Sequence, residues 1–163
     1  MKTLLLFLAT SSLAAANGNL LDQMKTRLAL QHDTPCSYDD QFRRGTATVP
    51  CGKTRGTVLH VCGPTPKLKA HSQNVAWKGK TFTPCGTFTN RWLLGVNAIK
   101  ATYTFETSLF DGQPCLVMQY PKGTPVFGGM RDEVREISPG TWLGRCTDSA
   151  TGQLKNYFLL QAK

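Results

Sequence analysis

The sequence lacks the motifs that mark common classes of enzyme. It has no Gly-x-Ser-x-Gly elbow and no phosphate-binding loop. It also has no Cys-x-x-Cys pair, which disfavours a zinc site or a dithiol redox centre. Only three histidines occur, and His32, His60 and His71 fall in separate segments. These absences predict no metal, no cofactor and no assignable catalytic residue.

Acidic residues are also scarce. Asp and Glu total 10 against 19 Lys and Arg, so the formal net charge is +9. A charge of this sign favours anionic partners such as polysaccharides or membrane headgroups. The basic residues are scattered, with no run of five like charges, so we expect no nucleic-acid binding. The composition predicts a soluble basic surface, with an anionic surface partner as the alternative.

Long apolar runs are absent beyond the first residues, so no transmembrane segment is expected. The amino-terminal residues have the pattern of a signal peptide, with Lys2, an apolar stretch at residues 4–9 and three alanines at residues 14–16. This pattern predicts cleavage before Asn17. Residues 1–16 are then a signal peptide, and residues 17–163 form a single domain that is secreted or held in the lumen of the secretory pathway.

Six cysteines follow the predicted signal peptide. An even number in an exported chain predicts disulfide bonds, although six cysteines allow 15 pairings. Neighbouring segments lie side by side in an antiparallel meander, so we expect sequential pairing. The predicted bonds are Cys36–Cys51, Cys62–Cys85 and Cys115–Cys146.

The apolar pattern changes along the chain from helical to strand-like. Apolar residues recur at helical spacing over residues 19–30. Beyond Gly45, Gly and Pro separate short segments, and residues 98–109 alternate apolar with polar side chains before a predicted hairpin turn at Asp111-Gly112. The pattern predicts a mainly β fold, an antiparallel β-barrel of about eight strands with a short N-terminal helix, stapled by disulfides. Strands are expected at Gly56–Cys62, Val75–Phe82, Phe88–Leu94, Ala98–Leu109, Pro114–Tyr120, Arg131–Ile137, Thr141–Cys146 and Asn156–Ala162, with no helix between them.

Four segments carry a recognisable pattern. They read W-K-G-K-x-F at residues 77–82, N-R at 90–91, L-F-D-G-x-P-x-L-V-x-x-Y at 109–120 and R-D-E-V-R-E-I-S-P-G-T-W-L-G at 131–144. Their order and spacing resembles a group of small, largely uncharacterised proteins with the pattern W-x-G-K-x-F … L-D-G-x-P-x-L-V-L-D-Y … R-D-E-I-R-E-V-x-P-G-L-Y-L-G. The resemblance implies a calycin-like barrel of the lipocalin or fatty-acid-binding type.

The resemblance extends over residues 48–162 and has two departures. Trp142 stands where the pattern has Tyr, which keeps an aromatic ring with a polar group. Gln119 stands where the pattern has Asp, so a role that needs a carboxylate at this position is not carried over. The resemblance implies no particular reaction.

The densest charge lies in the segment 131–137. As a strand, it would place Arg131, Glu133 and Arg135 on one face and Asp132 and Glu136 on the other. If the first face points inward, its arginines can bind an anionic headgroup. Cross-strand ion pairs at the surface and a buried structural network are the two alternatives. If the second face points inward, an acidic pair replaces the anion clamp. The candidate ligand-binding residues are Arg131, Glu133, Arg135, Tyr103, Tyr120, Trp77 and Trp142.

Three functions remain compatible with the sequence. The first is a secreted barrel that binds a small apolar or amphipathic ligand, which the aromatic residues and the arginine row favour. The second is a cofactor-free enzyme, such as an isomerase, cyclase or lyase, in which Asp132 or Glu133 acts as a general acid or base. The third is a secreted interaction protein with a basic surface and a filled interior.

Overall fold

The computed structural model describes residues 20–31 and 33–163. The predicted signal peptide and His32 lie outside the described residues. Eight strands in the described part form one antiparallel sheet in the order β1-β8-β7-β6-β5-β4-β3-β2, which confirms the predicted eight-strand antiparallel sheet. The strands are β1 (Thr54–Val61), β2 (Trp77–Phe82), β3 (Thr87–Trp92), β4 (Asn97–Thr107), β5 (Pro114–Gln119), β6 (Met130–Ser138), β7 (Thr141–Asp148) and β8 (Leu154–Ala162).

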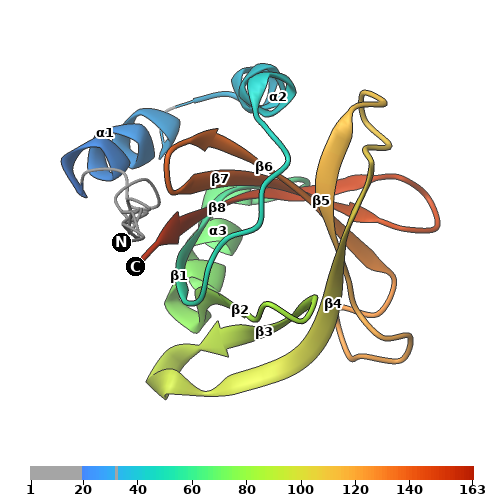
Figure 1. Cartoon of the computed structure of the whole chain (residues 1–163). Coiled ribbons are helices and arrows are strands. Elements are labelled where there is room, and N and C mark those ends of the chain that lie inside the picture. The colour runs from blue at the N-terminus through green and yellow to red at the C-terminus, as the bar shows by residue number, and fades with distance from the viewer. Residues whose placement is uncertain (1–19, 32) are drawn as a thin grey trace, which may run out of the picture.

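The sheet curls into a nearly closed barrel whose seam lies between β1 and β2 (Figure 1). An isolated antiparallel bridge joins Lys53 to Thr81 at this seam. Two glycines allow the close approach. A Cβ on Gly56 would lie 2.6 Å from the Cα of Gly79 and 2.5 Å from the Trp77 ring, and Gly79 itself has φ of +118°. Larger residues at these two positions would therefore push the seam apart.

Three α-helices accompany the barrel in the part of the chain that the structure describes, and α1 (Leu20–Gln31) lies where the sequence predicts a helix. Helix α2 (Pro35–Arg44) is capped by Thr34, whose hydroxyl accepts a hydrogen bond from the Ser37 amide. Helix α3 (Pro66–Ala76) is inserted between β1 and β2, so the prediction of no helix between the strands is wrong. A proline at its first turn favours this start, and a 3₁₀ turn at Leu93–Gly95 follows β3.

Both faces of the sheet are buried over β5 to β8. The inner face forms the barrel core, with Leu116, Val134 and Phe158 among its members. On the outer face, Tyr38 and Phe42 of α2 pack against an outer core made by side chains of β5, β7 and β8, and Figure 1 shows α2 lying outside the barrel beside β6 and β7. Helix α2 thus gives this side of the barrel a second apolar layer.

The predicted disulfides are wrong, because all six cysteines are free thiols. The sheet itself separates Cys115, which belongs to the outer core, from Cys146, which belongs to the inner core. Cys62 and Cys85 follow the ends of β1 and β2, which run antiparallel at the seam, so these two residues lie toward opposite ends of the barrel. The remaining predicted bond, Cys36–Cys51, would have joined the outer helix α2 to the segment before β1. Both of these thiols are instead free and exposed.

Candidate functional site

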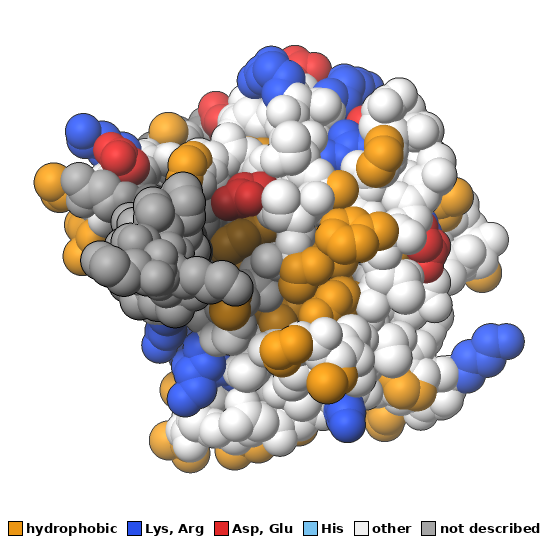
Figure 2. Space-filling model, in the orientation of Figure 1, with side chains coloured by type: hydrophobic (Ala, Val, Ile, Leu, Met, Phe, Trp, Pro, Cys, Tyr) orange, Lys and Arg blue, Asp and Glu red, His pale blue; other side chains and the backbone are white. Residues whose placement is uncertain are grey.

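The barrel encloses a cavity of about 420 Å³. It reaches the surface between α3, where Ser72 and Gln73 are exposed, and the segment before β6, where Val126 is 80% exposed. In Figure 2, hydrophobic side chains gather over the middle of the face, while basic side chains lie around its rim. The cavity is lined by Val58, Ser72, Gln73, Ala76, Trp77, Lys80, Asn90, Trp92, Tyr120, Val126, Phe127, Met130, Asp132, Cys146, Asn156 and Phe158.

Aromatic rings make most of the cavity wall. The Trp77 ring meets Phe158 edge-on at 5.8 Å between centroids. Phe127 packs against both Trp92, at 5.8 Å, and Tyr120, at 5.2 Å. These rings come from β2, β8, β3 and the segments beside β5 and β6, so the wall exists only in the assembled barrel. Such a wall suits the apolar part of a ligand.

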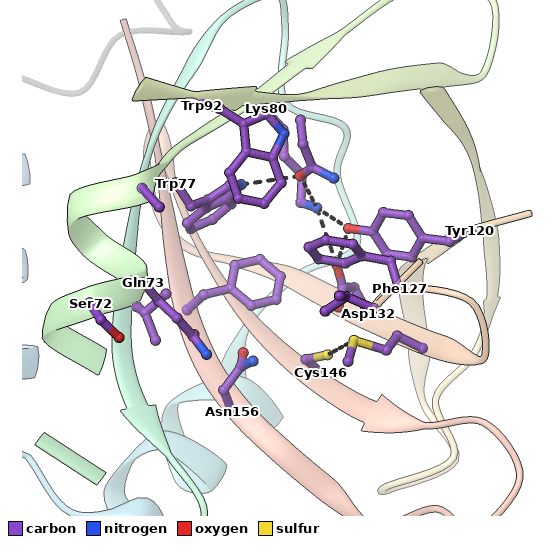
Figure 3. A pocket seen from close by; sticks show the side chains of 16 residues that line it. Ser72, Gln73, Trp77, Lys80, Trp92, Tyr120, Phe127, Asp132, Cys146 and Asn156 are labelled. Atoms are coloured by element: carbon purple, nitrogen blue, oxygen red, sulfur yellow. Dashed lines mark hydrogen bonds and ion pairs between the residues drawn. The ribbon is translucent and has the colours of Figure 1, made fainter. Parts of the chain in front are cut away.

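A buried lysine lies at the inner end of the cavity (Figure 3). Lys80 is 2% exposed. Its Nζ donates hydrogen bonds to Asn90 Oδ1 at 3.1 Å, to Tyr120 Oη at 2.5 Å and to Asp132 Oδ2 at 3.2 Å. Tyr120 also donates to the same Asp132 oxygen at 3.0 Å, and the Trp77 indole donates to Asn90 Oδ1 at 3.1 Å. We call Lys80, Asn90, Tyr120 and Asp132 the polar cluster.

A β-bulge in β2 points Lys80 into the cavity. Trp77 pairs with Trp92 and Gly79 pairs with Arg91, so Lys78 is the extra residue on β2. The bulge changes the phase of alternation, and Trp77 and Lys80 consequently line the same cavity although they are three positions apart. Gly79 adopts the positive φ that this change requires.

The polar cluster holds its charges in an apolar setting. Lys80 and Asp132 form an ion pair in which both side chains are buried, and the Lys80 Nζ also lies 4.6 Å from the Phe88 ring centroid. Burial lowers the pKa of Lys80, and the neighbouring Asp132 partly opposes this shift. Burial raises the pKa of Tyr120 well above its usual value, and Asp132 adds to the rise. The ammonium form of the lysine is therefore less favoured here than in water.

One buried donor of the cluster has no acceptor. The side chain of Asn90 is fully buried, and its Nδ2 has no hydrogen-bond partner in the described part of the chain. An unpaired buried donor is costly, by about 1–3 kcal/mol. Because Asn90 lines the cavity, an oxygen of a bound ligand is well placed to accept this hydrogen bond.

Of the aromatic residues proposed from the sequence, the structure brings two to the cavity. Trp77 and Tyr120 line it. Trp142 belongs to the inner core, and its indole donates to Thr48 Oγ1 at 2.8 Å. The Tyr103 hydroxyl donates to the Thr83 carbonyl at 2.5 Å, at the surface. Neither Trp142 nor Tyr103 is part of the cavity lining.

The proposed arginine row lies on the outer face of β6, away from the cavity. Arg135 is 1% exposed, and its guanidinium binds Asp111 through two hydrogen bonds of 2.7 Å. Glu133 accepts hydrogen bonds from the Ser108 hydroxyl at 2.6 Å and from Arg131 Nε at 3.0 Å. This geometry is the buried structural network that the sequence left as an alternative, and it ties the β4–β5 hairpin to β6.

Comparison with known proteins supports the barrel fold and goes no further. No family model matches the chain, and no curated protein matches it. A solved structure described as a protein from Thermomonospora curvata superposes with a TM-score of 0.59 and 14% identity, covering 87% of this chain and 97% of that one. At this identity the likeness concerns the fold alone, and the calycin-like assignment stays a prediction.

The recognisable sequence segments contain five of the residues that meet at the cavity. The W-K-G-K segment supplies Trp77 and Lys80, the N-R segment supplies Asn90, and the two later segments supply Tyr120 and Asp132. Strict alternation along a strand would place Trp77 and Lys80 on opposite faces, so the sequence pattern alone did not indicate Lys80 or Asn90 as cavity residues. Gly79 lies between Trp77 and Lys80, and a glycine within a strand often marks a bulge, so it was the one sequence signal of the changed alternation. No group of His, Cys, Asp and Glu suited to a metal occurs in residues 20–31 and 33–163.

Proposed function

We propose that this barrel binds a small, largely apolar molecule that carries one oxygen-containing polar group. The observation that carries the proposal is the division of the cavity into an aromatic wall and a single polar cluster at its inner end. A volume of about 420 Å³ falls in the range of small-molecule sites. The polar group of the ligand would lie against Lys80, Asn90 and Tyr120, and its apolar body would extend toward α3.

Two substitutions on α3 test this placement. Ala76 lines the cavity and Val75 does not, although both are exposed neighbours on the same helix. Ala76→Trp should occupy the entrance and weaken binding of a probe such as cuminyl alcohol at least about tenfold, or 1.4 kcal/mol. Val75→Trp is the matched control and should bind normally. Isothermal titration calorimetry measures both. Absence of binding in the wild type, together with no co-purified ligand in native mass spectra, contradicts the proposal.

A second candidate function is the binding of an anion at a basic pocket outside the barrel. A hollow of about 410 Å³ is lined by five basic side chains and no acidic one. Burial, and secondarily the positive charge of Arg55, lowers the pKa of Arg27 at this pocket, so an anion there would relieve repulsion between like charges. The lining residues are Arg27, Arg55, Gly56, Thr57, Asn74, Lys78, Arg91 and Lys163.

Pyrophosphate is a suitable probe for this pocket. Arg55 is exposed and makes no ion pair with the described residues, so Arg55→Gln removes one charge with little effect on the fold. We expect the variant to bind pyrophosphate several-fold more weakly, on the order of 1 kcal/mol. Lys122→Gln, an equal charge change at an exposed site off the pocket, is the control. Equal loss in both variants would mean that only net charge matters.

We also propose that the protein is exported, with cleavage before Asn17. With no disulfide formed, the cysteines lend no support to export, and this proposal is carried by the sequence of residues 1–16 alone. Among the described residues, no helix has both the length and the apolar character needed to cross a membrane. Expression in a secreting host and mass measurement of the protein in the medium test the cleavage site.

A further inference from the structure

We propose that Lys80 forms a covalent imine with an aldehyde or ketone that enters the cavity. This inference names the ligand class of the binding function proposed above and rests on it. Lys80 supplies the one primary amine among the residues that line the cavity. An amine held in an apolar site, beside groups that can accept and donate protons, is the arrangement that lysine needs to act as a nucleophile.

The polar cluster provides each group that the addition requires. Asp132 Oδ2 lies 3.2 Å from Nζ and can accept its proton, which leaves the neutral amine. Tyr120 contacts both groups and can pass a proton between them. The unpaired Asn90 Nδ2 can donate a hydrogen bond to the carbonyl oxygen and polarise it.

The reaction balances without an oxidant or a reductant. Asp132 takes one proton from the ammonium group, and the Nζ electron pair then forms a bond to the carbonyl carbon while the carbonyl π electrons move to oxygen. A proton passes from nitrogen to this oxygen through Tyr120, giving a carbinolamine. Asp132 returns its proton to the hydroxyl group, the C–O bond breaks, water leaves, and the nitrogen lone pair forms the C=N bond. The product is a protonated imine beside the Asp132 carboxylate.

Charge conservation favours this product inside the barrel. The ion pair between ammonium and Asp132 becomes an ion pair between protonated imine and Asp132, so the buried site neither gains nor loses net charge. The surrounding rings of Phe88 and Tyr120, which lie 4.6 and 5.1 Å from Nζ, face a cation in both states. Burial also lowers the pKa of Lys80. Near pH 7, each unit by which the pKa of an amine falls increases its neutral fraction about tenfold.

Reductive trapping tests the imine. The full chain is incubated with equimolar cuminaldehyde and cyanoborohydride, which converts an imine into a stable secondary amine, and the modified lysine is located by peptide mass mapping. We expect one cuminyl group per chain, with at least about tenfold more product on Lys80 than on any other lysine. Product spread over surface lysines, with none on Lys80, would overturn the proposal.

Two variants and one unreactive probe separate the possible failures. Lys80→Arg keeps a cation beside Asp132 and should lose the trapped product, whereas Lys78→Arg alters the neighbouring lysine that the bulge places outside the cavity lining and should keep it. Cuminyl alcohol has the same apolar body and cannot form an imine. If the alcohol binds and the aldehyde is not trapped on Lys80, the imine is overturned and the binding function stands. If neither molecule binds, both proposals fail for this ligand class.

Discussion

The single extra residue of the β2 bulge places the side chains of Lys78 and Lys80 in two different environments. These lysines stand two positions apart in a strand, where regular alternation would place them on the same face. The bulge at Lys78 and Gly79 leaves Lys80 buried in the polar cluster and Lys78 at the basic pocket outside. The chemistry of the cavity thus depends on a backbone irregularity that periodicity arguments do not contain.

The ion pair between Lys80 and Asp132 predicts a non-additive pair of substitutions. Lys80→Met leaves a buried carboxylate without its partner and should lower the free energy of unfolding by about 3–5 kcal/mol. Lys80→Met combined with Asp132→Leu removes both charges and should recover most of that loss. Urea denaturation measures all three proteins. Equal destabilisation in the single and double variants would show that the charges are not coupled.

At the scale of elements, the sequence assigned the residues of β6 to two faces but did not show which face points into the barrel. Asp132 lines the cavity and Val134 lies in the barrel core, while Arg131, Glu133 and Arg135 face outward. The outward face of a barrel strand ordinarily meets solvent, which would suit the charges. Here α2 and the β4–β5 hairpin cover it, and Arg135 stacks on Phe42 with its guanidinium carbon 4.5 Å from the ring centroid. The charges are therefore retained in a buried network.

The bond between Asp111 and Arg135 predicts a change in acid stability. The hydrogen bonds from Arg135 lower the pKa of Asp111 below its value in the unfolded chain. The unfolded chain then binds more protons in acid, so this stabilisation is full above about pH 4 and is lost as the pH falls through the lowered pKa. Asp111→Asn should cost about 3 kcal/mol at neutral pH and flatten the stability curve in acid.

The exposed pair of Asp40 and Arg43 gives the matched control for this experiment. It joins the same residue types, at 3.1 Å, on the surface of α2. Asp40→Asn should change the free energy of unfolding by less than about 1 kcal/mol. Chemical denaturation at a series of pH values compares the three proteins. An acid limb as steep in Asp111→Asn as in the wild type would disprove the assigned role.

At the scale of the whole molecule, turn spacing was enough to predict an antiparallel sheet of eight strands. Hairpin turns such as Asp111-Gly112 are local, and sequential strands joined by such turns pair with one another. Helix α3 was missed because its end, Val75–Ala76, reads equally well as the start of a strand. The residues that line the cavity could not be predicted, because they come from β1, β2, β3, β6, β7, β8, α3 and the segment between β5 and β6, whose mutual distances no local pattern contains.

The absence of disulfide bonds among the described residues predicts how many cysteine thiols react with a thiol reagent in solution. A thiol reagent added to the native protein without reductant should react readily with the exposed Cys36, Cys51 and Cys85. Cys115 and Cys146 are buried, and burial raises the pKa of Cys115 to about 12, which suppresses the reactive thiolate. All six thiols should react in denaturant. A lower count in denaturant would demonstrate disulfide bonds.

The pairing of β1 with β8 has a consequence for biosynthesis. The first strand of the barrel hydrogen-bonds to the last, with Thr54 opposite Ala162. This pairing joins residues about as far apart in sequence as the sheet allows, so it closes late and at high entropic cost. A ribosome-bound chain that has completed β7 still lacks Asn156 and Phe158 of the cavity wall. Under the binding function proposed above, ligand capture must therefore follow the synthesis of β8, because a barrel without this strand lacks part of the cavity wall.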